Sequence, residues 1–257
     1  MCGRFVITSA PAAIREAFAY VDQPNFPARY NIAPTQPIPV VILDGGARRF
    51  RLMRWGFLPS WVKDPKAFAL VINARAETVF EKPAFRNAIR RRRCLVPTDG
   101  YYEWRAIGSR KQPYFIQPQG GGPIGFAGVW ETWVGSNGEE LDTVAIVTTA
   151  AEGRMTELHD RVPVTIAPDD YACWLDADET DVEGVAGLLR SPPDGLFVWC
   201  AVSSAVNRVA NDNPQLILPI SDEEAQAVQA RAPKPPAAKR AGRAKLPTED
   251  SGQGSFF

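Results

Sequence analysis

Short stretches in which apolar and polar residues alternate make up much of the first 200 residues of the chain. Side chains alternate between the two faces of a strand, so this period predicts strands that bury one face. Two such stretches flank Asp44-Gly45-Gly46 and two more flank residues 135–138, which predicts two β-hairpins. The predicted strands span residues 4–7, 37–43, 49–55, 94–97, 114–117, 124–133, 141–149, 162–166 and 196–202.

Helical signals are fewer and shorter. Ser9 and Pro11 suit an N-cap and a first-turn position, so they predict a helix over residues 12–19. Further helices are expected over residues 84–93, 168–175, 182–189 and 222–230, with one or two helical turns over 152–158. This mixture of hairpins and scattered helices predicts an α+β fold, a single domain with a largely antiparallel, curved, barrel-like β-sheet flanked by helices.

The composition changes sharply near residue 232. Over all 257 residues, 45% are hydrophobic and 23% are charged, which is ordinary for a globular protein with a substantial core. From Pro233 onward, prolines and basic residues replace the large apolar residues that a core needs. We therefore expect one compact catalytic domain over residues 2–230 and a disordered basic tail over residues 231–257.

The charge balance limits the kinds of partner. The chain has 29 basic and 29 acidic residues and a formal net charge of zero, so any affinity for nucleic acid must come from a local patch. No apolar run approaches the roughly 18 residues of a membrane span, and no secretory signal is recognisable. Four widely spaced cysteines and one histidine argue against a disulfide framework and against a structural zinc site. We expect a cytoplasmic protein that needs no metal and no cofactor.

The residue after the initiator methionine is Cys2, and a small second residue usually allows the initiator to be removed. The mature chain would then begin with a 1,2-aminothiol, whose amine and thiol have reference pKa values of about 7.7–8.0 and about 8.5. Both groups keep a nucleophilic fraction near neutral pH. An aldehyde forms an imine with such an amine, and the thiol can then close a thiazolidine ring. The alternative is that Cys2 is a small buried residue at the start of a strand.

Several short motifs occur in order along the chain. They are Cys2-Gly3-Arg4, Trp55-Gly56, Asn73-Ala74-Arg75-Ala76-Glu77, Cys94-Leu95-Val96-Pro97 followed by Gly100-Tyr101-Tyr102-Glu103-Trp104, Phe126-Ala127-Gly128-Val129-Trp130, and His159-Asp160-Arg161-Val162-Pro163. As an ordered set they resemble the SOS-response-associated peptidase (SRAP) family, from Cys2 to about Pro163 and more weakly to about Pro219. Val162 departs from the family pattern, which more often has methionine there.

The resemblance implies a reaction and the residues that carry it. Members of the family form a thiazolidine crosslink with abasic sites in single-stranded DNA, so Cys2 would supply both nucleophiles. An imine intermediate also permits β-elimination, which implies DNA lyase activity alongside crosslinking. Glu103 matches the family's catalytic glutamate, His159 its histidine and Asn73 its asparagine.

Each of these three residues has a functional and a plainer interpretation. Tyr102 and Trp104 beside Glu103 would desolvate its carboxyl and raise its pKa toward the range needed for proton transfer, whereas a strand glutamate can also simply face solvent. His159 would assist opening of the sugar or move a proton, or it is a structural residue. Asn73 would orient the sugar or the amine through its neutral amide, or it is a turn residue.

For DNA binding, the resemblance implies phosphate contacts by Arg4 and Arg75, and Arg161 is expected to face the same groove. Trp61 lies in an aromatic segment and is a candidate for stacking on a base or wedging at a strand junction, with a core position as the alternative. The run Arg90-Arg91-Arg92-Arg93 is expected to be mainly a solvated helix face, with one or two members reaching phosphate. Residues 126–130 are expected to form buried sheet.

Three classes of function remain open. The first is an abasic-site sensor that crosslinks to single-stranded DNA. The second is an N-terminal-nucleophile thiol peptidase or amidohydrolase, for which removal of Met1 would be self-processing. The third is a single-strand-binding module that leaves no covalent product.

The tail suggests a second partner. The chain ends Gln253-Gly254-Ser255-Phe256-Phe257, which looks like the short peptides that bacterial proteins insert into the sliding clamp. The expected partners are thus single-stranded DNA containing abasic sites and the clamp, bound through Gln253, Phe256 and Phe257. We expect a monomer that is associated with the nucleoid when it is bound to DNA.

Overall fold

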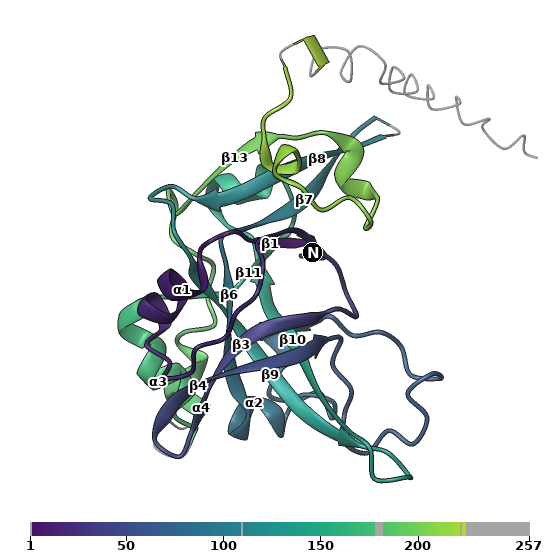
Figure 1. The fold of residues 1–257 in the computed structure, drawn as a ribbon, viewed down its shortest axis with the longest axis vertical. Coiled ribbons are helices and arrows are strands. Elements are labelled where there is room, and N and C mark those ends of the chain that lie inside the picture. Colours follow the sequence, from purple (N-terminus) through teal and green to yellow (C-terminus); the bar gives the residue numbers. More distant parts are fainter. Residues whose placement is uncertain (1, 109, 178–181, 222, 225–257) are drawn as a thin grey trace, which may run out of the picture.

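The computed structural model describes residues 2–108, 110–177, 182–221 and 223–224, and Figure 1 shows their arrangement. Five strands close into a barrel: β3 (Pro37–Asp44), β4 (Ala47–Trp55), β10 (Glu140–Ala150), β9 (Ile124–Val134) and β6 (Arg93–Thr98), with β6 pairing back to β3. All pairings in this ring are antiparallel except that of β4 with β10. The curved, barrel-like antiparallel sheet expected from the sequence is confirmed.

Three short strands extend the barrel. β5 (Asn73–Arg75) runs parallel to β10 beyond the end of β4, β11 (Arg161–Pro163) pairs antiparallel with β10, and β12 (Thr165–Ile166) pairs antiparallel with β9. The single strand predicted over residues 162–166 is therefore split between two partners, because Val164 donates its N–H to Val147 and marks the crossing point. This edge of the barrel carries much of the site described below.

A second, five-stranded antiparallel sheet lies at the other end of the molecule, above the barrel in Figure 1. Its order is β13 (Phe197–Ala201), β8 (Arg110–Pro118), β7 (Gly100–Ile107), β1 (Phe5–Ile7) and β2 (Arg29–Ile32). The chain passes from the barrel to this sheet between β6 and β7, at Asp99. The Asp99 carboxylate accepts the backbone N–H groups of Thr8 (2.6 Å) and Ser9 (2.8 Å), so this corner is fastened to the end of β1.

Helices are short, and the longest in the described residues has eight. They are α1 (Pro11–Phe18), α2 (Ala88–Arg91), α3 (Tyr171–Leu175) and α4 (Val182–Ala186), with 3₁₀ turns η1 (Ala76–Thr78), η2 (Gly153–Glu157), η3 (Pro168–Asp170), η4 (Ser204–Asn207) and η5 (Pro214–Ile217). No helix in the described part of the chain is long and apolar enough to cross a membrane.

Packing explains why β6 lacks the alternating pattern of a half-buried strand. All six of its residues are buried, since α2 and α3 cover the side that faces away from the barrel interior. Trp174 of α3 donates its indole N–H to the carbonyl of Cys94 at 2.8 Å. The continuous apolar run in the sequence therefore corresponds to a strand covered on both faces.

Several sequence predictions need correction. Ala10, not Ser9, is the N-cap of α1, and the Ser9 hydroxyl donates instead to Asp99, because the chain must first be tied to the β6–β7 corner. The helix predicted over residues 84–93 shortens to α2, since Arg93 already belongs to β6. Strands β2, β5 and β7 were not among the predicted strands. The predicted helix over 222–230 and the tail over 231–257 lie largely outside the described residues, and the proposed domain limits stay a prediction.

The hairpin predictions are confirmed. β3 and β4 pair from Pro37 opposite Arg54 to Asp44 opposite Ala47, around Gly45 and Gly46. The two glycines have φ of 59° and 78°, so both occupy the left-handed region that this tight turn requires. β9 and β10 form the second hairpin.

Candidate active site

The site begins at the N-terminal strand. Cys2 lies three residues before the start of β1, its side chain is fully buried, and its carbonyl accepts a hydrogen bond from Asn73 Nδ2 at 2.9 Å. Asn73 opens β5, opposite Ile146 of β10. The start of the chain is therefore fixed against the edge of the barrel by the side chain predicted to position it.

Strand alternation orients Asn73 and Arg75 together. Ala74 between them is fully buried, so its two neighbours project from the opposite face of β5, where Arg75 is exposed. Asn73 Oδ1 is buried and has no hydrogen-bond partner among the described residues. An unsatisfied buried acceptor destabilises a fold by about 1–3 kcal/mol, so such an atom is suited to receive a proton donor from a ligand or from the terminal amine.

Glu103 lies in β7 with only 3% of its surface exposed. Burial raises the pKa of its carboxyl above the ordinary value, and the positive charge of His159 partly opposes that shift. The predicted rise in the pKa of Glu103 is confirmed. A raised pKa makes this carboxyl better suited than an ordinary glutamate to exchange a proton in a reaction near neutral pH.

The two neighbours of Glu103 in β7, which were predicted to desolvate it, have polar partners of their own. Tyr102 and Trp104 alternate with Glu103 along β7 and make their polar contacts elsewhere: Tyr102 donates to the carbonyl of Tyr30 (2.7 Å) and Trp104 to Asn207 Oδ1 (2.8 Å). Glu103 instead interacts electrostatically with Cys2 and Tyr101, both fully buried. Glu103 and Tyr101, two residues apart, therefore lie on the same face of β7.

Burial, followed by the nearby Glu103 carboxylate, also raises the pKa of the Cys2 thiol far above its ordinary value. The thiol is therefore held in its neutral form in the absence of a ligand. A catalytic cysteine that attacks an amide needs the opposite, a lowered thiol pKa. The environment of Cys2 suits a thiol that adds after another group has reacted first.

His159 lies between η2 and β11 and is about one-quarter exposed, at 28% of its side chain. Its Nδ1 accepts the backbone N–H of Arg161 at 3.0 Å, and the same atom is 2.5 Å from Asp160 Oδ1. The two contacts compete for one atom: the backbone N–H needs an unprotonated Nδ1, which leaves the proton of the neutral ring on Nε2, whereas the Asp160 carboxylate needs a protonated Nδ1.

An open cleft of about 620 Å³ lies beside Glu103 and His159, and neither Cys2 nor Asn73 is among its lining residues. It is lined by Glu103, Trp104, Arg110, Lys111, His159 and Asn207. Arg110 and Lys111 are exposed on β8, and sequence reasoning missed them as candidates for contact with an anion. They follow the β7–β8 turn, where Ile107 pairs with Arg110. The pairing of the two strands, which the sequence did not predict, is what brings them to the cleft.

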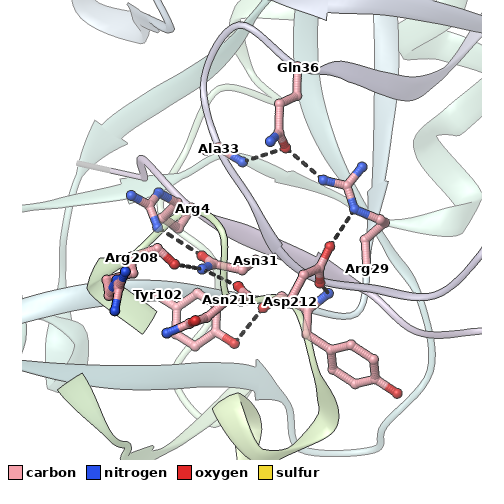
Figure 2. A network of polar contacts seen from close by, with 10 residues as sticks. Arg4, Arg29, Asn31, Ala33, Gln36, Tyr102, Arg208, Asn211 and Asp212 are labelled. Carbon is pink, nitrogen blue, oxygen red and sulfur yellow. Dashed lines mark hydrogen bonds and ion pairs between the residues drawn. The ribbon is translucent and has the colours of Figure 1, made fainter. Parts of the chain in front are cut away.

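Arg4 has a structural role that the sequence did not indicate. Figure 2 shows its guanidinium against Asn31, with Nη1 donating to Asn31 Oδ1 and to the carbonyl of Val206, both at 2.8 Å. Asn31 is fully buried, and its Nδ2 donates to the carbonyls of Val206, Arg208 and Asn211. The network thereby fastens the segment that follows η4 to β1 and β2.

The other predicted DNA-binding residues fall into two groups. Trp61 is 60% exposed, with its ring edge-on to Phe68 at 5.8 Å between centroids, so the alternative of a core position is excluded. Arg75 is exposed near Asn73, whereas Arg161 is only 13% exposed and forms a bidentate ion pair with Glu77 at 2.7 and 2.9 Å. The charge of Arg161 is therefore already balanced within the chain.

The arginine run does not form one solvated face. Arg90 and Arg91 are exposed, but Arg92 pairs with Glu131 and lies over the ring of Trp130. Arg93 is buried and donates to the carbonyls of Trp174 (2.5 Å), Asp176 (2.6 Å) and Ile89 (3.1 Å). The expectation of a mainly solvated run is wrong for Arg93, because β6 begins there and turns it inward. Of residues 126–130, predicted to form buried sheet, 126–129 are buried in β9 and Trp130 is half-buried.

These features define a class of protein: an α+β fold around a five-stranded barrel, with an N-terminal cysteine beside a buried acid, an asparagine and a histidine. The chain belongs to the SOS response associated peptidase (SRAP) family, whose family model matches residues 1–209. It is 37% identical over 221 residues to the abasic site processing protein YoqW of Bacillus subtilis (strain 168), covering 84% of this chain and 99% of that one. It is 31% identical to the abasic site processing protein YedK of Escherichia coli (strain K12), covering 86% and 100%.

Solved structures share the fold. A phage-related protein of Bordetella bronchiseptica superposes with a TM-score of 0.65 at 33% identity, covering 78% of this chain and 94% of that one. A protein of Bacteroides thetaiotaomicron superposes with a TM-score of 0.78 at 23% identity, covering 86% of this chain and all of that one. The second likeness bears on the fold alone.

Proposed function

We propose that the protein processes abasic sites in DNA by capturing them covalently through Cys2, after removal of Met1. The observation that supports this most directly is the bond from Asn73 to the Cys2 carbonyl beside the buried carboxyl of Glu103. The names of the relatives, which refer to abasic site processing, agree with it. The substrate is the open aldehyde form of the abasic deoxyribose.

The reaction proceeds in two bond-forming steps. The Cys2 amine adds to the aldehyde carbon, and the resulting carbinolamine loses water to give an imine. The Cys2 thiol then adds to the imine carbon, its proton passes to the nitrogen, and a thiazolidine ring closes. The product is the aldehyde and the amino terminus joined with loss of one water.

Each polar side chain has a step that suits its environment. Glu103, whose carboxyl pKa burial raises, gives the proton that lets the hydroxyl leave as water, takes back a proton from the nitrogen as the imine forms, and relays the thiol proton to the nitrogen when the ring closes. Asn73 Oδ1 accepts a hydrogen bond from the amine or from the sugar and orients the two reacting groups. His159 presents Nε2–H at the cleft and assists opening of the sugar.

The DNA strand would pass over the exposed residues around this site. Arg75 is exposed and can contact a phosphate. Arg4 and Arg161 already donate to partners within the chain, so they would offer DNA only the N–H groups that these bonds do not use. Trp61 offers an exposed ring on which an unpaired base can stack, and this favours single-stranded DNA. An imine that escapes ring closure would undergo β-elimination, which accounts for lyase activity as a side reaction.

The thiol peptidase is the alternative, and Cys2 argues against it. Attack on an amide requires a thiolate, but burial and Glu103 both raise the pKa of this thiol. Capture of an aldehyde begins at the amine and needs the thiol only afterwards. A plain single-strand-binding module would leave the orientation of Asn73 toward Cys2 unexplained.

Further proposals concern the rest of the chain. A DNA-bound role places the protein in the cytoplasm at the nucleoid, as a monomer. Binding of the sliding clamp through Gln253, Phe256 and Phe257 lies outside the described residues; deleting residues 255–257 should abolish pull-down by the clamp, and retention of binding would contradict the idea.

The capture proposal is tested on a denaturing gel with single-stranded DNA that carries one abasic site. Wild type should give a shifted band without any reductant. Cys2→Ala and Cys2→Ser both keep the terminal amine and lack the thiol, so without reductant neither should give a band, and each should still give strand cleavage and a band after borohydride trapping. A Cys2→Ala band as strong as that of wild type without reductant would overturn the role of the Cys2 thiol.

A further inference from the structure

His159 is held in place by a chain of contacts that begins at Glu77. Glu77 lies in η1, just after the strand that carries Asn73, and its carboxylate accepts Arg161 Nη1 at 2.7 Å and Nη2 at 2.9 Å. Glu77 Oε1 also accepts the backbone N–H of Ala150 at 3.1 Å. One carboxylate thus joins the end of β10 to the start of β11.

The guanidinium of Arg161 is fixed on a second side as well. Its Nη2 donates to the carbonyl of Thr148 at 2.5 Å and lies 3.2 Å from the Thr148 hydroxyl. The side chain therefore spans from β10 to η1, with Glu77 as its only anionic partner among the described residues. These bonds also lower the pKa of Glu77, so the pair is fully charged at neutral pH.

The backbone of Arg161 makes the contact that matters for chemistry. Its N–H donates to His159 Nδ1 at 3.0 Å, and the carbonyl of Asp160 accepts the N–H of Ala151 at 2.9 Å. While Nδ1 accepts this N–H, the neutral imidazole carries its proton on Nε2. The competing partner of Nδ1 is the Asp160 carboxylate at 2.5 Å, which would hold the proton on Nδ1 but is largely exposed to solvent. The backbone contact of Arg161 therefore favours one tautomer and one ring orientation at the cleft that His159 shares with Glu103.

We propose that Glu77 is a positioning residue for His159: by clamping Arg161 it keeps the backbone N–H of Arg161 on Nδ1 and holds Nε2–H toward the cleft. The consequence for catalysis rests on the proposed function. The orienting role itself does not, because it concerns the state of one imidazole in the free protein.

A positioning role and a DNA-contact role predict opposite changes in the affinity for single-stranded DNA when Glu77 is neutralised. Removing the negative charge of Glu77 leaves the positive charge of the Arg161 guanidinium without its partner, so the surface near the site becomes more positive by one charge. Affinity for an intact single strand should therefore stay the same or rise, while the step that needs His159 slows. Loss of a DNA contact, or general unfolding, would lower affinity and rate together.

The first test reads His159 directly by NMR. It is the only histidine in the chain, so the imidazole nitrogen signals need no assignment. At a pH where the ring is neutral, the wild-type protein should show one tautomer with the proton on Nε2, and Glu77→Gln should move both nitrogen shifts toward a mixture of tautomers. Asp44→Asn, which breaks the Asp44–Arg51 surface ion pair of 2.9 Å, is the matched control and should leave both shifts unchanged. Identical shifts in wild type and Glu77→Gln would overturn the proposal.

The second test is a double-mutant cycle on the rate of adduct formation. Glu77→Gln should slow capture about tenfold, within the roughly 10²-fold expected for His159→Ala, and should add nothing in the His159→Ala background. Multiplied effects in the double mutant would show that Glu77 acts by another route and would refute the proposal. Failure of the wild-type protein to capture abasic DNA would instead refute the proposed function, and the NMR result would still decide the role of Glu77.

Discussion

Two asparagines in this fold should respond in opposite ways to the same substitution. Asn31 is fully buried and satisfied: Oδ1 accepts from Arg4, and Nδ2 donates to three carbonyls. Asn73 has one such bond, to the Cys2 carbonyl, and its buried Oδ1 has no partner among the described residues. If the role of Asn73 is to orient the reacting groups, its replacement should lower the rate of adduct formation far more than the free energy of unfolding.

The magnitudes follow from these contacts. Asn31→Ala loses the bond from Arg4 and the two that the hydrogens of Nδ2 share among three carbonyls, at about 1 kcal/mol each, so the free energy of unfolding should fall by about 3 kcal/mol. Asn73→Ala loses one bond of about 1 kcal/mol but also removes an orphan acceptor that destabilises the fold by about 1–3 kcal/mol. Its free energy of unfolding should therefore lie within about 1 kcal/mol of wild type or slightly above it. Its rate of adduct formation should fall on the order of 10²-fold, because the reacting groups lose their orientation.

Urea denaturation of the three proteins at one pH, together with single-turnover capture on denaturing gels, measures both quantities. The slopes of the unfolding transitions must agree for the comparison to hold. A loss of more than about 2 kcal/mol in Asn73→Ala would show that Oδ1 is satisfied in the folded protein. Unchanged capture by this variant would remove Asn73 from the reaction.

Three further predictions concern single residues. Because the folded-state pKa of Glu103 is raised, the stability linked to its protonation is complete below the unfolded pKa of about 4.3 and is lost as the pH rises through the folded value. Glu103→Gln should therefore be more stable than wild type in urea at pH 8, with a smaller gain at pH 4.5, and it should capture poorly; an equal gain at both values would contradict this. Arg93→Ala should lower the free energy of unfolding by about 3 kcal/mol or more, since three carbonyls lose a charged donor. The control Arg90→Ala, at an exposed position, should change it by no more than about 0.5 kcal/mol. Similar losses in the two variants would be inconsistent with the burial of Arg93. Arg75→Ala should reduce the salt dependence of single-strand binding by about 0.7 in the slope of log K against log salt, and an unchanged slope would exclude a phosphate contact.

The sequence predicted the strands best where one face is buried and the turn is chemically marked. Gly45 and Gly46 at the β3–β4 turn and the glycines between β9 and β10 are such marks, and both hairpins form as expected. It predicted β2 and β5 least well, because three- and four-residue strands in a segment rich in proline or loop-like residues are stabilised by their neighbours rather than by their own pattern. β5 exists because β10 extends beyond β4 and leaves an edge to pair with.

The site was predictable as a set of residues but not as a set of contacts. Cys2, Asn73, Glu103 and His159 stand 71, 30 and 56 positions apart along the printed sequence, and only the fold brings them to one place. The partners of Arg4, Arg93 and Arg161 depend on segments more than 70 residues away, so their internal roles had no local signal. Glu77 belongs to the same motif as Asn73, but only its ion pair suggests a function.

The central claim is that the amino terminus of Cys2 captures an aldehyde and the thiol closes the ring. Intact mass spectrometry of the protein, with Met1 removed, incubated with a single-stranded abasic oligonucleotide tests it most directly. The account predicts a species whose mass is the sum of both molecules less one water, unchanged by borohydride, because a thiazolidine has no C=N bond to reduce. An adduct that gains two hydrogens on borohydride treatment would be an imine and would contradict ring closure, and the absence of any adduct would contradict the capture itself.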